Sequence, residues 1–215
     1  MASVPTGTTF FIASAYGSAK ATTIVSNAAE AVVTSAAHGY SNGDVVEVTS
    51  GWGRLNKRHA RIKSVTTDTF VLEGIDTSNT DFYPTGSGLG SVRKVTTFTQ
   101  IVQVLGINSS GGEAKNVPYK YYESDVEFSI NDGFTAQVRT LELDSDSIGT
   151  AGYTALKTLT DVQTDTCLLT QSRSGKKSYQ SCTVALNETE QFQDGQINRV
   201  VLAVNGTGRA VRYAS

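Results

Sequence analysis

The sequence predicts a mainly β protein that contains one helix. Short stretches of alternating apolar and polar residues recur along most of the 215-residue chain, and such alternation is typical of half-buried strands. Thr, Ser, Gly and Val are abundant and charged residues make up only 18%, a composition that suits strands and turns. Only Ala151 to Gln163 places apolar residues at helical spacing, after the capping-type residues Asp144 to Ser147. A single amphipathic helix in such a protein is expected to lie across a sheet.

The clearest strands lie between Val32 and Leu72. The turn sequence His38-Gly39-Tyr40-Ser41-Asn42-Gly43-Asp44 leads into a strand over Val45 to Thr49, because its glycines and asparagine tolerate positive φ. Strands over Arg61 to Val65 and Thr69 to Leu72 follow. This segment resembles the small β-barrel module first named for its place in ubiquitin-activating enzymes. That module recurs as an insertion in phage tail and baseplate proteins, where it carries no catalytic group.

The segment Tyr122 to Ile130 alternates most regularly. One face carries Tyr122, Ser124, Val126, Phe128 and Ile130, and the other carries Glu123, Asp125, Glu127 and Ser129. We expect the apolar face to join a core. The acidic face has two interpretations that the sequence leaves open, a solvated edge strand that discourages aggregation and an acidic wall that repels a polyanion.

A glycine-rich segment, Gly106 to Pro118, follows a strand predicted over Val95 to Leu105. A phosphate-binding loop would need a Gly-Lys-Ser/Thr ending and a helix, and neither follows. Lys115 alone does not supply that chemistry. A mobile loop is therefore favoured, and the segment could be a hairpin arm that orders only on contact with a partner.

The two cysteines, Cys167 and Cys182, lie in a predicted hairpin around Ser174-Gly175. A two-residue turn there would place them directly opposite each other. Directly opposed strand positions constrain the S–S torsion, and cytosolic thiols stay reduced. We therefore expect two buried free thiols.

The sequence contains no recognisable catalytic or metal-binding motif. Its two histidines and two cysteines show no zinc-ligand spacing, and no serine lies in a nucleophile-elbow pattern. Asp144-Ser145-Asp146 is similar to the start of a calcium loop, but the later glycine and glutamate positions fail, so helix capping is favoured. We predict that the chain is not an enzyme and needs no cofactor.

Charge and hydropathy point away from nucleic-acid and membrane binding. The formal net charge is −2, which gives no strong attraction for polyanions or anionic lipids. A basic cluster of Arg54, Lys57, Arg58, Arg61 and Lys63 is favoured as a solvated face, since only Trp52 could stack on bases nearby. No secretory signal is seen at Met1 to Phe10, and no apolar run approaches the ~20 residues of a membrane helix. A protein made in a cytoplasm is expected.

Outside the central module, the chain resembles the major tail tube protein of long, flexible-tailed phages. The resemblance spans most of the chain and depends on the order of several short motifs. They are Thr8-Thr9-Phe10, Ala15-Tyr16-Gly17, Gly51-Trp52, Leu55-Asn56, Ser91-Val92-Arg93-Lys94-Val95-Thr96-Thr97, Gly152-Tyr153-Thr154-Ala155-Leu156-Lys157, Leu186-Asn187-Glu188-Thr189 and Val211-Arg212-Tyr213-Ala214.

The resemblance implies a β-sandwich with one flanking helix, formed by residues 1–21 and 96–215, that assembles into six-fold rings stacked as a hollow tube. Residues 22–95 would be an inserted β-barrel on the outside of the tube. The segment Gly106 to Pro118 would be an arm that reaches the neighbouring ring. We expect this arm to stay disordered in a soluble monomer until an initiating ring or a tape-measure complex templates assembly. The arm candidates are Gly106, Asn108, Gly111, Gly112, Lys115 and Pro118.

By the same resemblance, the tube encloses DNA that passes without specific binding. An acidic bore would repel phosphate, and the candidates that face it are Glu123, Asp125, Glu127 and Glu142. The implied partners are further copies of the chain, the tape measure protein, the tail terminator and the baseplate initiator. The implied location is the virion tail, assembled in the host cytoplasm.

Two other readings remain open from the sequence. A carbohydrate-binding or adhesion module would use Trp52, Tyr83 and Tyr119 to Tyr122 as sugar platforms. A head-tail connector or tail terminator would form one ring and stop.

Overall fold

The computed structural model describes residues 6–214. Sixteen strands, one 3-10 turn and one α-helix make up this part of the chain. In chain order they are β1 (Thr9–Tyr16), β2 (Lys20–Thr22), β3 (Ile24–Val25), β4 (Val32–Thr34), β5 (Val45–Ser50), β6 (Arg58–Lys63), β7 (Thr69–Leu72), β8 (Gly90–Ile101), β9 (Val104–Ser110), β10 (Ala114–Tyr119), β11 (Phe128–Phe134), β12 (Val138–Asp144), η1 (Ser145–Ser147), α1 (Ala151–Val162), β13 (Thr166–Gln171), β14 (Lys177–Gln191), β15 (Arg199–Gly206) and β16 (Val211–Tyr213).

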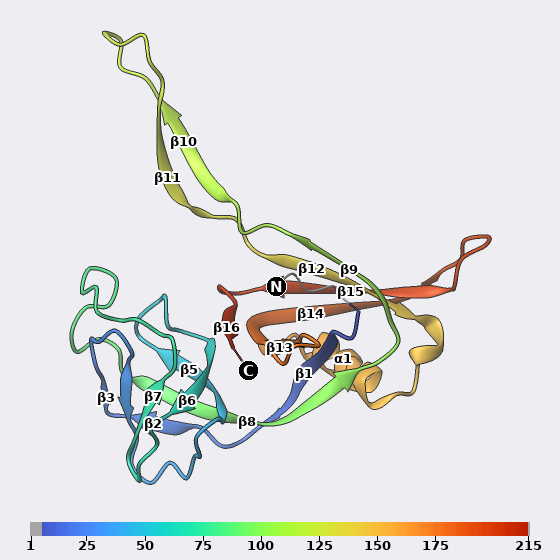
Figure 1. Ribbon diagram of the computed structural model, residues 1–215, viewed down its shortest axis with the longest axis horizontal. Coiled ribbons are helices and arrows are strands. Elements are labelled where there is room, and N and C mark those ends of the chain that lie inside the picture. Colours follow the sequence, from blue (N-terminus) through green and yellow to red (C-terminus); the bar gives the residue numbers. More distant parts are fainter. Residues whose placement is uncertain (1–5, 215) are drawn as a thin grey trace.

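Most strands belong to one curled sheet. Its order is β3-β4-β7-β6-β5-β8-β1-β13-β14-β15-β12-β9, with β2 paired to β8 and β16 paired to β14. The remaining two strands, β10 and β11, pair only with each other and leave the body as a long hairpin (Figure 1). The mainly β fold with a single helix is thus confirmed.

The 12-residue strand β8 connects two parts of this sheet. Its first half pairs with β2 and β5, and its second half pairs with β1. Strands β2 to β7 gather with the first half of β8 at one end of the molecule (Figure 1), and we call this part the small sheet. The predicted strand over Thr69 to Leu72 has the observed bounds of β7.

The predicted strand over Val95 to Leu105 is wrong in its bounds. It is divided between β8 and β9, and the break falls at Gln103, whose φ is +57°. A non-glycine residue in the left-handed region changes the direction of the chain, so the apolar run on either side cannot stay one strand.

Two apolar clusters stabilise the fold. The inner cluster lies on the face of the sheet that α1 covers, and it contains Phe10, Ile12, Leu141, Leu143, Tyr153, Leu156, Leu168, Val184 and Leu202. The outer cluster joins the small sheet to the opposite face of the body, and it contains Trp52, Leu55, Phe70, Leu72, Cys167, Leu169, Tyr179 and Tyr213. Because β13 is covered on both faces, its first four residues are all buried.

The helix is confirmed, but its cap lies closer to it than expected. Thr150 is the N-cap, and its hydroxyl accepts a hydrogen bond from the Tyr153 amide at 3.3 Å. Asp144 instead caps the separate 3-10 turn η1. Tyr153 and Leu156 are buried on the inner cluster, whereas Val162 at the end of the helix is exposed.

The cysteines are buried free thiols, as predicted, but they do not face each other. Cys167 lies opposite Ser181, and Cys182 lies opposite Thr166. Residues 172–176 connect the two strands in place of a two-residue turn, and this moves the register by one position. A shift of one residue places the thiols on opposite faces of the sheet, in different clusters. Burial raises the pKa of Cys182 to about 12 and raises that of Cys167 well above its ordinary value, so both thiols are inert at neutral pH.

Candidate assembly surfaces

A projecting hairpin is the most prominent surface feature of the molecule (Figure 1). Strand β10 pairs with β11 from Ala114 opposite Phe134 to Tyr119 opposite Phe128. At 3.4 Å per residue, the five steps from Ala114 to Tyr119 carry the tip about 17 Å from the hairpin base. Strands occupy most of Gly106 to Pro118, so the prediction of a loop is wrong in its secondary structure, whereas the alternative of a hairpin arm matches the β10–β11 pair.

The predicted arm residues fall in three places. Gly106 and Asn108 lie in β9 within the sheet, opposite Glu142 and Thr140 of β12. Gly111 and Gly112 lie between β9 and β10, and Lys115 and Pro118 lie in the projecting strand β10. The sequence did not indicate these strands because Gly, Ser and Asn interrupt the apolar alternation. Their hydrogen-bonding partners, β11 and β12, come later in the chain.

Two glycines form the bend between the body and the hairpin. The φ angles of Gly111 and Gly112 are +79° and +81°. A Cβ atom on Gly111 would lie 1.8 Å from the carbonyl oxygen of Ala136, so only glycine fits there. The Gly112 amide donates to the Thr135 carbonyl at 3.1 Å, and this bond holds the bend in place.

The acidic strand predicted over Tyr122 to Ile130 is also wrong. Residues 120–127 form the tip of the hairpin, and the strand begins only at Phe128. The Ser124 hydroxyl accepts a hydrogen bond from the Val126 amide at 3.1 Å, and this local bond favours a turn over a strand. Glu123, Asp125 and Glu127 consequently lie on an exposed tip, separate from Glu142 in the sheet.

The hairpin has one apolar face. Val117 lies opposite Ile130 and Tyr119 lies opposite Phe128, two positions apart and therefore on the same face. Val117 is 50% exposed and Ile130 is 59% exposed, so the face expected to join a core is uncovered within residues 6–214. An exposed apolar surface of this kind marks an interaction site.

The sheet formed by β9, β12, β15 and the end of β14 has one open face. Leu141 and Leu143 point into the inner cluster, so Thr140 and Glu142 point outward. Apart from Arg199, the outward positions on the neighbouring strands are mostly small or uncharged, and they include Asn108, Ser110, Ala185, Asn187, Ala203 and Asn205. Glu142 is paired with Arg199 at 3.0 Å on this open face.

The small sheet is attached to the body by a buried polar network around His59. The Ser181 hydroxyl lies 2.8 Å from His59 Nδ1 and also accepts the His59 backbone amide at 3.1 Å. The other ring nitrogen, Nε2, lies 3.0 Å from the Tyr16 hydroxyl, so each ring nitrogen of His59 has one hydroxyl partner. Burial, assisted by the charge of Arg93, lowers the pKa of His59 to about 3, so the imidazole is neutral and structural.

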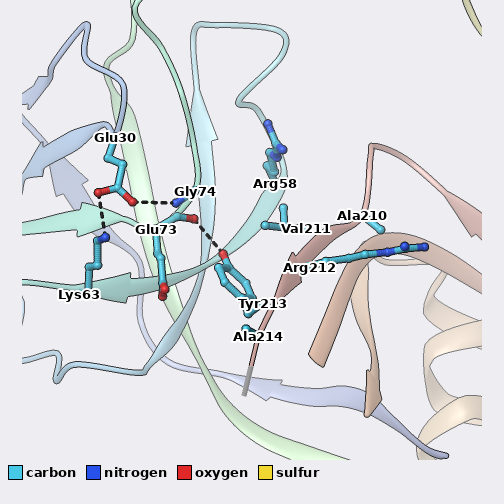
Figure 2. A pocket seen from close by; sticks show the side chains of 10 residues that line it. All are labelled: Glu30, Arg58, Lys63, Glu73, Gly74, Ala210, Val211, Arg212, Tyr213 and Ala214. Atoms are coloured by element: carbon cyan, nitrogen blue, oxygen red, sulfur yellow. Dashed lines mark hydrogen bonds and ion pairs between the residues drawn. The ribbon is translucent and has the colours of Figure 1, made fainter. Parts of the chain in front are cut away.

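A second contact between the two parts lies beside the C-terminal strand. Figure 2 shows the Tyr213 hydroxyl directed at the backbone of Glu73 in the small sheet, to whose carbonyl it donates at 3.1 Å. The same oxygen accepts the Arg61 amide at 2.9 Å, and the Arg61 guanidinium lies over the Tyr213 ring. These bonds across β16 fix the orientation of the small sheet on the body.

We expect acid to destabilise the attachment of the small sheet to the body, because His59 is buried there as a neutral imidazole. The unfolded imidazole has its ordinary pKa of about 6.5, whereas the folded one has a pKa of about 3. Above pH 6.5 both states are neutral and the stability is fully present. Below pH 6.5 only the unfolded state binds the proton, so the free energy of unfolding falls by up to about 1.4 kcal/mol per pH unit. Urea unfolding at several pH values between 7 and 4 gives the free energy of unfolding as a function of pH. This free energy should fall less steeply with acid in His59→Gln, which keeps every carboxylate of the wild type but lacks the imidazole. Equal slopes in the two proteins would contradict the assignment to His59.

A basic cleft lies where the small sheet, the hairpin base and the loop between β15 and β16 meet. Its volume is about 740 Å³, and its cations are Arg54, Lys57, Arg58 and Arg209. Of the basic cluster expected as a solvated face, three members form ion pairs: Lys57 with Asp165, Arg61 with Glu73 and Lys63 with Glu30. Arg54 instead stacks on Phe82, with 3.3 Å between the guanidinium carbon and the ring centre.

The aromatic residues expected as sugar platforms do not form one surface. Trp52 is only 2% exposed, and its indole N–H donates to the Pro84 carbonyl at 2.8 Å. Tyr83 is buried against Trp52, with the two rings edge to face. Only Tyr121 and Tyr122, at the hairpin tip, are exposed. A flat glycan platform that includes Trp52 and Tyr83 is therefore excluded.

Within residues 6–214, no group of three or more His, Cys, Asp or Glu side chains could hold a metal ion. No helix in the same range is long and apolar enough to cross a membrane.

A curled β body with an uncovered apolar hairpin is typical of a protein that assembles with other chains. The sequence comparison agrees with this class. The family described as phage tail tube protein (TTP) matches residues 50–215, which include the second half of the small sheet and everything after it. The chain therefore belongs to the phage tail tube protein family and is a structural tail component. No curated protein matches the chain.

Proposed function

We propose that this chain is the repeating subunit of the phage tail tube, in which hexameric rings stack around the path of the ejected DNA. The observation that carries the proposal is the hairpin of β10 and β11, whose apolar face is uncovered within residues 6–214 of a tail tube family member. An apolar face on a projecting arm would be covered when a second subunit binds it. The tape measure protein, the tail terminator and the baseplate initiator are the further partners of such a tube.

The open face of the β9-β12-β15 sheet is our candidate for the lumen. It presents small, mostly uncharged side chains, and Glu142 lies on it in an ion pair with Arg199. Such a surface offers DNA few cations, so little binding energy is gained by counterion release. A lumen position for Glu123, Asp125 and Glu127 stays a prediction, and the strand on which it was based is absent.

Residues 22–95 would decorate the outside of the tube, and residues 1–21 with 96–215 would form its wall. This division is supported by β8, which pairs with the small sheet before Val95 and with β1 from Val95 onward. The small sheet packs on the β13 and β14 end of the sheet face opposite α1, whereas the β9, β12 and β15 end of the same face is left open.

Cryo-electron microscopy of the concentrated, purified chain tests this function. We expect hollow tubes with a regular axial repeat, six subunits per ring, Glu142 on the bore and the small sheet as outer knobs. Single closed rings would instead indicate a connector or terminator. A tube wall that buries Glu142 between subunits would overturn the lumen assignment alone.

A further inference from the structure

The basic cleft has the chemistry of a carboxylate receptor. Arg54 lies over the Phe82 ring and Arg209 over the Phe134 ring, and neither has an ion-pair partner within residues 6–214. No acidic residue of the described chain lines the cleft. A guanidinium stacked on an aromatic ring keeps its N–H edge free for a carboxylate, to which it can donate two hydrogen bonds.

Arg58 adds a second, independent observation. Its side chain lines the cleft, and its Nε atom is buried without a hydrogen-bond acceptor in the described chain. Burial also lowers the pKa of Arg58. A buried donor without an acceptor is costly, and an incoming carboxylate would remove that cost.

The hairpin tip carries the matching groups. Glu123, Asp125 and Glu127 lie within five residues on the exposed tip, beside the exposed ring of Tyr122. The tip therefore offers three exposed carboxylates and an aromatic ring to a cleft of about 740 Å³ that is lined by cations.

The tip cannot reach the cleft of its own chain. Gly133 and Phe134, at the hairpin base, form one wall of that cleft. The paired strands carry the tip about 17 Å away from this wall. The occupant must therefore come from another copy.

We propose that the tip carboxylates of Glu123, Asp125 and Glu127 dock into the basic cleft of a second copy, where Arg54, Arg58 and Arg209 receive them. This inference rests on the proposed function and names the contact that joins its subunits. The contact is heterologous, since tip and cleft are different surfaces, so it can repeat from copy to copy without end or close into a ring. Because a docked tip is buried between subunits, the proposal excludes a lumen position for the same carboxylates.

The experiment exchanges the charges. The tip variant carries Glu123→Lys, Asp125→Lys and Glu127→Lys, and the cleft variant carries Arg54→Glu and Arg209→Glu. Association is measured by analytical ultracentrifugation and tube formation by electron microscopy, after circular dichroism has shown that each variant is folded. We expect each variant alone to associate at least 10-fold more weakly than the wild-type chain.

An equimolar mixture of the two variants should recover wild-type association, because each tip then meets a cleft of opposite charge. The matched control is Glu190→Lys with Asp194→Lys, which reverses the acids near the β14–β15 turn and should leave association unchanged.

Three results would overturn the docking proposal: wild-type association by the tip variant, no recovery in the mixture, or an equal loss in the control. Intact tubes of the tip variant in phage that eject DNA more slowly would restore the lumen reading. Loss of DNA binding by the cleft variant without loss of association would assign the cleft to a polyanion. If wild-type chains form only closed rings and the mixture of variants still recovers association, the tube proposal would be wrong and the docking proposal would stand.

Discussion

Replacing Val117 and Ile130 with aspartate is expected to raise the concentration needed for tube formation at least about 100-fold. The two side chains face each other on the apolar face of the hairpin, and each is about half exposed in the single chain. Covering what remains exposed contributes about 1 kcal/mol per side chain. Burying two aspartates without partners adds at least about 1 kcal/mol of cost, and about 2.8 kcal/mol corresponds to 100-fold. Light scattering against protein concentration measures the threshold.

The control for this variant carries the same charges on the other face of the hairpin. Asn116 and Ser129 are exposed and lie on the polar face, so Asn116→Asp with Ser129→Asp should leave the threshold within about threefold of wild type. The unfolding free energy should be unchanged in both variants, because the hairpin packs on no part of either cluster. Equal thresholds for the two variants would show that the apolar face is not a subunit contact.

Trp52→Ala is expected to lower the free energy of unfolding by about 3–5 kcal/mol, the largest effect of any single substitution considered. Trp52 is 2% exposed, packs edge to face on Tyr83 and donates its indole N–H to Pro84. Its removal therefore leaves a cavity and takes away one of the two donors to the Pro84 carbonyl, which keeps the Ser87 amide at 3.2 Å. Urea unfolding measures the change.

The matched control is Phe192→Ala, since Phe192 is 71% exposed near the β14–β15 turn and its loss should cost less than about 0.5 kcal/mol. The Trp52 variant also tests whether the small sheet is a decoration. If residues 22–95 lie outside the tube wall and take no part in subunit contacts, the variant should still form tubes at low temperature, without ordered outer knobs. If the tip docks on Arg54 and Arg58, the same variant should associate more weakly. Loss of the tube itself under conditions where the body stays folded would place the small sheet within the wall.

The sequence pattern was sufficient to predict those features that depend only on residues close together in the chain. The bounds of β7 follow from alternation between turns, and α1 follows from helical spacing. The thiols are buried because Cys167 and Cys182 sit in apolar strands whose neighbours in sequence already predict burial. Each of these features depends on residues close together in the chain, so no knowledge of distant partners was needed.

Features that depend on pairing between distant segments were decided only by the tertiary structure. Gly106 to Ser110 is a strand because β12 pairs with it, and its Gly and Ser residues show no alternation of their own. The regular alternation of Tyr122 to Ile130 indicated a core strand, yet its apolar residues from Phe128 onward face away from the chain. Alternation of apolar and polar residues predicts that one face of a strand will be covered, but it does not indicate whether the same chain or another copy covers that face. The basic cleft likewise exists only because Arg54 and Arg209, 155 positions apart, are brought together by the pairing of β16 with β14 and the contact of β6 with the body.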